Sequence, residues 1–417
     1  GMAQDLGANF KRDKNVSVRQ RPRPDYEAIG VKAGGFTLYP RVTAEVVNDD
    51  NIYAVATGEQ SDTIWRVKPE VAARSNWSRN ALGAFASASV NRYSNFDTEN
   101  TEEYTLGVNG RLDVERGAYV SASTQWQKLT EPRSAITAGM PAGATAKPVE
   151  YYLWSENITA VKEFNRLRLT GKVDAKRFNY DDQGGAFNQN SRDRDEFYYG
   201  GKAEYAVSPD TAVFASLVGN KKSYDVDFLG KPAIPASPGV PAQAAKPALR
   251  ARDSDGYAAT VGSDFDLSQA VRGSVEAGYM SQSYDHYATI DGFTAKGLVE
   301  WFPTELTTLN VAGSRSIEES VATGSQGFIS NNASVGVDHE LMRNVLLSAK
   351  ASYGKDSYEL VDREDKRTGF NASAAYLLNR NVGLFLTYNY LKQESAGVAK
   401  GSSFSDNKLS ASVALQF

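Results

Sequence analysis

Apolar and polar residues alternate along most of the chain from position 36 onward. In the last segment, Leu409, Val413 and Leu415 alternate with Ser410 and Ser412. A period of two is the pattern of a β-strand, because successive side chains of a strand point to opposite faces. The alternation therefore predicts strands over nearly the whole chain.

The segments number about eighteen, and each is near the ~9–11 residues that a tilted strand needs to cross a bilayer. Their connections alternate between short turns, such as Glu115-Arg116-Gly117, and longer polar stretches. Barrels of the outer membrane combine short periplasmic turns with longer external loops. The predicted external loops lie near 49–62, 94–101, 130–148, 180–194, 224–253, 319–328 and 394–402.

One face of the predicted strands is charged, and the other carries Val, Leu, Ala, Gly, Tyr and Phe. A Lys or Arg on the lipid face costs roughly 2–4 kcal/mol at the bilayer midplane, so the charged face must point inward, into water. The predicted pore-lining residues are Arg66, Lys68, Glu70, Arg111, Asp113, Arg168, Lys172, Asp174, Lys176, Lys202, Glu204, Arg272, Glu276, Lys296, Glu300 and Lys350.

The predicted fold is therefore all-β: a transmembrane, up-and-down antiparallel β-barrel of about eighteen strands over residues 36–417. A barrel of this size is wide enough for an aqueous channel. Residues 1–35 are basic and Pro-rich without an apolar period, which predicts a flexible periplasmic arm. The alternative is an arm that binds a partner or an acidic polymer. A precursor with a signal peptide is expected, and Gly1 is interpreted as an expression remnant.

Composition narrows the function. The chain has no cysteine, which excludes thiolate catalysis, cysteine-ligated zinc and Fe–S clusters. Its 46 basic and 50 acidic residues are nearly balanced, which argues against nucleic-acid binding. His286 and His339, the two histidines, are expected at opposite rims, and neither GxSxG nor HExxH occurs. No catalytic residue and no cofactor is predicted.

Two neighbouring segments carry a family resemblance: LYPRVTAEVVNDDNIY at Leu38–Tyr53 and SDTIWRVKPEVAARSNW at Ser61–Trp77. A strand containing proline, a D-D-N-I-Y turn and a second strand with a Pro-x-Val core resemble the "Putative beta-barrel porin 2" family. The resemblance implies an outer-membrane barrel of a Gram-negative bacterium whose first hairpin these segments form. It also suggests a link to exopolysaccharide secretion, and it carries no catalytic residues.

The last strand also resembles a known signal. Val413 and Leu415 precede Phe417 at alternate positions, as in the segment that the barrel-assembly machinery recognises. The alternative is a strand that happens to end in phenylalanine.

Two acidic stretches could bind cations. Asp49-Asp50-Asn51 offers hard oxygen ligands for calcium, but further ligands at a fixed spacing are lacking. An Asx-rich turn is therefore preferred, and no metal site is predicted. The stretch 97–103 contains four acidic residues; it is interpreted as a solvated loop, with a cation bridge to lipopolysaccharide phosphates as the alternative.

Residues 229–250 are rich in Pro and Ala and show no strand period. Prolines exclude ladder pairing there. The preferred interpretation is a floppy external loop, and the alternative is a loop that folds into the lumen as a constriction.

The function predicted from the sequence is passive passage through a polar lumen with weak ion selectivity, connected with exopolysaccharide export. One alternative is a plugged structural or adhesive barrel that acts through its external loops, and a second is an outer-membrane enzyme. Expected partners are outer-membrane lipid and lipopolysaccharide, the barrel-assembly machinery, and polysaccharide or export components.

Overall fold

The computed structural model describes residues 10, 15–135, 147–181, 189–226, 234–243, 250–268, 270–322 and 324–417. Strands dominate these residues, with short 3-10 helices at Pro24–Tyr26 (η2), Asp97–Glu99 (η3) and Asn190–Arg192 (η5). No helix in the described ranges is long and apolar enough to cross a membrane. The strands are β1 Val31–Ala33, β2 Phe36–Asp49, β3 Asp62–Ser75, β4 Ala81–Tyr93, β5 Thr101–Glu115, β6 Ala118–Thr130, β7 Glu150–Phe164, β8 Leu167–Tyr180, β9 Arg194–Ser208, β10 Thr211–Tyr224, β11 Ser254–Leu267, β12 Val271–Tyr284, β13 Ile290–Thr304, β14 Thr307–Glu319, β15 Gly327–Met342, β16 Val345–Tyr358, β17 Glu364–Leu377, β18 Val382–Ala396 and β19 Phe404–Gln416.

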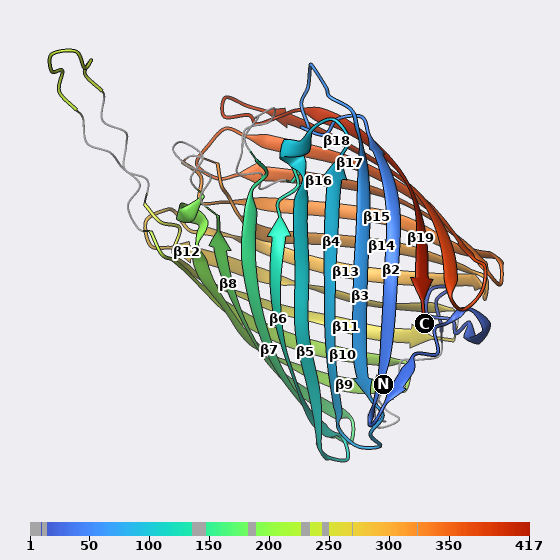
Figure 1. Cartoon of the computed structure of the whole chain (residues 1–417). Helices are drawn as coiled ribbons and strands as arrows, with labels where there is room; N and C mark the ends of the chain where they lie inside the picture. The colour runs from blue at the N-terminus through green and yellow to red at the C-terminus, as the bar shows by residue number, and fades with distance from the viewer. Residues whose placement is uncertain are drawn as a thin grey trace.

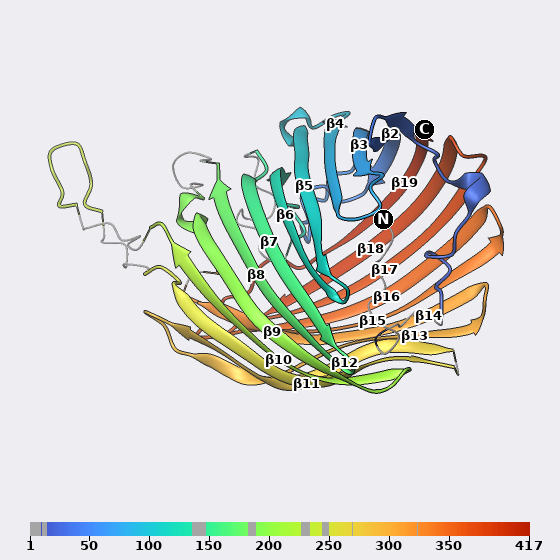
Figure 2. The same cartoon turned by 90° about the horizontal axis from the view of Figure 1, so that it is seen from below.

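The strands β2 to β19 form one closed barrel (Figures 1 and 2). Each pairs antiparallel with its neighbours in the sequence, and β19 pairs with β2 to close the sheet. The closing register runs from Lys408 opposite Asp49 to Gln416 opposite Arg41. Closure leaves no unpaired edge, which is the condition for a sheet to span a bilayer. The eighteen-strand up-and-down barrel predicted from the alternation is confirmed.

The barrel strands are longer than the alternation predicts. They contain 13 to 16 residues, as in β4 and β15, against the ~9–11 needed to cross the bilayer. The excess carries the sheet beyond the hydrocarbon region, where strand ends are bathed in water.

The two ends of the barrel differ in their connections. At one end, here the short-turn end, the turns are tight, and at Arg116-Gly117 the left-handed backbone of Gly117 (φ 77°) permits the reversal. The C-terminus and strand β1 lie toward this end (Figure 1). At the other end, the long-loop end, the connections are 50–61, 94–100, 131–149, 181–193, 225–253, 285–289, 320–326, 359–363 and 397–403. Only 285–289 and 359–363 have no counterpart among the predicted loops.

Candidate functional site: the two faces of the barrel wall

Exposed apolar side chains cover the outer surface of the barrel, and the aromatic ones gather near both ends of the strands. Toward the long-loop end lie Trp65, Tyr104, Trp126, Trp154, Phe197, Tyr199, Tyr257, Tyr279 and Phe293. Toward the short-turn end lie Phe164, Tyr205, Trp301 and Tyr376. Two aromatic girdles around an apolar band are the mark of a barrel seated in a membrane.

Charged residues on the outward face lie mostly near the ends of the strands, with most ion pairs at the long-loop end and Lys162–Glu115 at the short-turn end. They form mixed pairs, such as Lys128 with Glu150 at 3.7 Å and Lys355 with Glu364 at 3.3 Å. Arg92–Glu102 and Lys392–Glu394 are further pairs of the same kind. These pairs mark where the apolar band gives way to a polar surface.

The sixteen residues predicted to line the pore all lie on the face opposite the exposed apolar belt. In β3, for example, Trp65 and Val67 are exposed, and Arg66 alternates with them. Residues directly opposite each other on paired strands lie on the same side of the sheet, so the register shows which residues of the next strand also point inward. Glu276 thus stands opposite Lys296, and Arg272 opposite Glu300.

Most of these inward charges are paired along the wall. Arg168 contacts Glu204 at 2.5 Å, and Lys202 reaches both Glu204 (3.2 Å) and Asp264 (3.1 Å). Arg272 contacts Glu300 at 2.9 Å. Partners such as Asp264 were missed by the sequence reasoning, although their position in the alternation places them on the inward face.

Lys296 and Lys350, like Lys176, differ from most of the predicted pore-lining cations, which are paired. Within the described ranges, no carboxylate lies within 4.0 Å of either ammonium group. Both line a lumen-side cavity of about 400 Å³, together with Asn332 and Arg367. Arg367 pairs with the fully buried Asp356 at 3.2 Å. This stretch of the wall, over β13 to β17, therefore presents two unpaired ammonium groups to the lumen.

At the long-loop end a second polar network fills the wall's inner side over β7 to β14. Arg192 pairs with Glu131 at 2.7 Å, and Lys222 pairs with Glu319 at 3.1 Å. The Tyr224 hydroxyl donates to the same Glu319 carboxylate at 2.6 Å. Glu131 and Arg192 belong to the external connections 131–149 and 181–193, whereas Lys222, Tyr224 and Glu319 lie at the long-loop ends of β10 and β14. Sequence reasoning did not predict this network, because Glu131 and Arg192 come from connections without a periodic pattern and the partner of Lys222 and Tyr224 lies in a strand distant in the sequence.

At the short-turn end the N-terminal segment lies against the inner wall. The Val18 N–H donates to the Thr308 hydroxyl at 3.0 Å, and Arg19 pairs with Asp338 at 2.9 Å. Farther along, Arg380 donates to the Pro24 carbonyl at 3.0 Å. Phe10 is buried against Ala206 and Ala212 on the far side of the same mouth.

Glu340 holds the centre of this N-terminal segment. Its side chain is 3% exposed, and its carboxylate accepts a hydrogen bond from the Arg21 guanidinium at 3.0 Å. The guanidinium groups of Arg23 and Arg343 lie 3.4 Å and 3.2 Å from the same carboxylate. Burial lowers the pKa of the Arg23 guanidinium, which the Glu340 carboxylate opposes. The described part of the arm is therefore docked, whereas the sequence predicted a flexible leader.

The Pro/Ala-rich loop is described only at 234–243. These residues form a small hairpin with bridges between Ile234 and Gln243 and between Ser237 and Val240. Every residue of the hairpin is exposed, and Figure 1 draws it projecting away from the barrel. For these residues the structure favours the surface loop over the constriction; the remainder of 229–250 is mostly outside the described residues.

The predicted assembly signal lies at the closing seam. Phe417 is exposed, and its N–H donates to the Pro40 carbonyl at 3.2 Å. Val413 and Leu415 are exposed on the outward face. Their recognition by the assembly machinery stays a prediction.

A closed eighteen-strand wall with an apolar outer belt and a charged inner face defines an outer-membrane porin-like barrel. The chain belongs to the family described as "Putative beta-barrel porin 2", whose sequence profile matches residues 23–417. The match begins before the barrel predicted over residues 36–417 and includes the docked Arg23. The assignment places the protein in the outer membrane of a Gram-negative bacterium.

The chain is also similar, at low identity, to several solved structures. The copper transporter OprC shares 11% identity over 95% of this chain and 84% of its own, with a TM-score of 0.49. OccAB3 of Acinetobacter baumannii shares 9% over 92% of this chain and 100% of its own, with a TM-score of 0.47. OccK9 (OpdG) of Pseudomonas aeruginosa shares 11% identity over 92% of this chain and 98% of its own, with a TM-score of 0.48. The comparison with curated proteins gave no match.

Proposed function

We propose that this barrel is a passive, non-enzymatic outer-membrane pore for small polar solutes. The observation that carries the proposal is the sorting of side chains between the faces. Charged residues that would be costly in lipid are arranged along the lumen wall, where they replace part of the hydration of a passing solute. The two histidines lie at opposite ends of the barrel: His286 is in the connection after β12 at the long-loop end, and His339 is near the short-turn end of β15. This separation argues against a shared catalytic site.

Lys296 and Lys350 set the expected selectivity. Paired inward charges largely cancel one another. Among the sixteen predicted pore-lining residues, Lys176, Lys296 and Lys350 form no ion pair within the described ranges, against one such carboxylate, Glu276 opposite Lys296. Fixed positive charge on a pore wall attracts anions and repels cations. The pore is therefore proposed to prefer anions weakly.

The test is conductance in planar lipid bilayers. Purified full-length barrel should form open channels with a mild anion preference, measured as the reversal potential in a salt gradient. Replacing both Lys296 and Lys350 with Glu should move the reversal potential toward cation preference. The matched control is Lys355→Glu, on the outward face at the long-loop end, which should leave selectivity unchanged. Folded protein that never conducts would reject the pore.

A plugged structural or adhesive barrel is the second candidate, and two features favour it. The N-terminal segment docks inside one mouth, and the Arg192–Glu131 and Lys222–Glu319 pairs link segments on the inner side of the wall at the other. A closed channel that opens when these contacts are removed would support this alternative.

The link to exopolysaccharide export rests on the family resemblance. In this proposal the lumen or the external loops would contact polysaccharide or components of an export system. Outer-membrane lipid and lipopolysaccharide would contact the outward face, where Arg92, Lys128 and Lys392 lie at the polar boundary. Loss of polysaccharide secretion on deleting the gene, restored by the wild-type gene, would support the link.

A further inference from the structure

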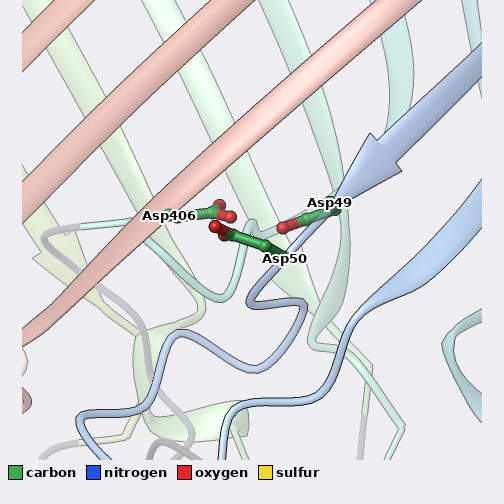
Figure 3. A group of neighbouring side chains, drawn as sticks. All are labelled: Asp49, Asp50 and Asp406. Atoms are coloured by element: carbon green, nitrogen blue, oxygen red, sulfur yellow. The ribbon is translucent and has the colours of Figure 1, made fainter.

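Three carboxylates converge at the long-loop end of the seam that closes the barrel (Figure 3). Asp49 ends β2, Asp50 follows it, and Asp406 lies near the start of β19. One oxygen of each lies within 4.8 Å of the others. The first two are adjacent in the sequence, but the third arrives from the other end of the chain only because the barrel closes.

Asp406 is the reason to look for a ligand here. Its side chain is buried, at 6% exposure, and its Oδ1 has no hydrogen-bond partner. An unpartnered buried carboxylate oxygen loses its hydration without compensation, which is costly. When all three carboxylates are ionised, the neighbouring carboxylates can only accept hydrogen bonds, so they do not satisfy this oxygen.

Lys408 alone does not balance the cluster. Its ammonium lies 3.9 Å from Asp49 and 3.7 Å from Asp406, both beyond good hydrogen-bond distance. When all three carboxylates are ionised, one ammonium group leaves the cluster with a net charge of about −2.

The surrounding backbone fixes two of the carboxylates. Asn407 donates to Asp50 from its backbone N–H and from its side-chain amide, each at 2.8 Å. The Asn51 N–H donates to Asp49 at 3.0 Å, and its side-chain amide donates to the Ser405 carbonyl at 2.9 Å. A carboxylate oxygen that accepts one such bond keeps a lone pair for a cation.

We propose that Asp49, Asp50 and Asp406 bind one divalent cation, calcium, which clamps the ends of the first and last barrel strands together. Calcium prefers oxygen ligands in irregular sets completed by water, whereas magnesium demands near-ideal octahedral geometry. With three carboxylates from the protein, we expect affinity in the range of extracellular calcium modules, about 10⁻⁴–10⁻³ M.

The test uses the full-length barrel in detergent, stripped of metal with EDTA and dialysed. Calorimetric titration with CaCl₂ should show one site per barrel, and CaCl₂ should raise the temperature at which the folded, fast-migrating gel band is lost. Asp406→Asn should weaken binding roughly tenfold or more, as the loss of a ligand predicts. Asp97→Asn, an exposed acid at the same end, is the matched control and should bind like the wild type.

A second pair of variants keeps the test decisive if Asp406→Asn folds poorly. Asp50→Asn changes an exposed position and should also weaken calcium binding. Lys408→Gln should strengthen it, because a competing positive charge is removed. No calcium binding by the folded wild type up to 10 mM, or binding unchanged in both Asp406→Asn and Asp50→Asn, would overturn the site. These measurements do not depend on channel conductance, so their outcome neither supports nor contradicts the pore proposal.

Discussion

Trp65 and Arg66 are neighbours in β3, but Trp65 faces lipid and Arg66 faces the lumen. Trp65 is 57% exposed on the lipid-facing belt, whereas Arg66 pairs with Glu45 across the lumen-facing ladder. The outward face needs only apolar character, so its side chains do not depend on particular neighbours. The inward face carries charges whose stability depends on the partner placed opposite by the register. The comparison predicts two different causes of lost stability. A substitution on the outer face should destabilise the barrel when it introduces a polar or charged group into lipid, and one on the inner face should destabilise it when it removes the partner of a charged residue.

The largest effect should follow from placing a charge on the wrong face of β19. Val413→Arg enters the apolar belt and should cost up to about 2–4 kcal/mol of barrel stability. Ser412→Arg, one residue earlier, points inward opposite Glu45 and should cost much less. Urea unfolding in lipid vesicles would measure both. Equal losses would mean that the face assignment is reversed in this strand, because a one-residue slip exchanges the faces.

A smaller effect is expected from breaking a buried inward pair. Arg367→Met removes the guanidinium that contacts Asp356 at 3.2 Å, and Asp356 is 0% exposed. The loss should be about 1.5–3 kcal/mol, the range for hydrogen bonds to charged groups. Lys392→Met on the outward face breaks an exposed pair with Glu394 and serves as the control.

The same unfolding measurement separates the two positions. A clear loss of stability in the Arg367 variant with little change in the Lys392 variant is expected, because exposed ion pairs contribute little. Similar losses in both would show that the inner pairs are no more important than the surface ones.

The docked N-terminal segment should affect conductance more than stability. Glu340→Gln removes the carboxylate that faces Arg21 and Arg23, so the segment should detach from the wall. Single-channel conductance should rise as this mouth widens. Lys32→Gln, at an exposed position in β1, is the control. Conductance that stays at the wild-type level in the Glu340 variant would show that the segment does not limit the pore.

The smallest effect is expected from the Pro/Ala-rich loop. Its described hairpin, 234–243, is exposed and projects from the barrel (Figure 1). Replacing 229–250 with a short Gly/Ser linker should leave both conductance and stability near wild type, as bilayer recordings and urea unfolding would show. A marked rise in conductance would instead support the alternative in which the loop folds into the lumen and constricts it.

The period of two along the chain was enough to predict the barrel, about eighteen strands and the shared face of the sixteen charged residues assigned to the lumen. The reason is local: the pleated backbone sends successive side chains to opposite sides, so face follows from position within a strand. Lipid on one side then decides which face must be apolar. The alternation therefore placed residues as far apart as Arg66 and Lys350 on one inner wall.

Contacts between distant segments could not be obtained this way. Asp406 meets Asp49 only when β19 closes on β2, and Asp338 meets Arg19 only because the N-terminal segment enters the mouth of the barrel. Register and closure decide such pairs, and neither is encoded in a local period. The sequence thus determined the wall and its two faces, whereas the tertiary structure decided which charges are partners and brought a third carboxylate to the Asp49–Asp50 turn.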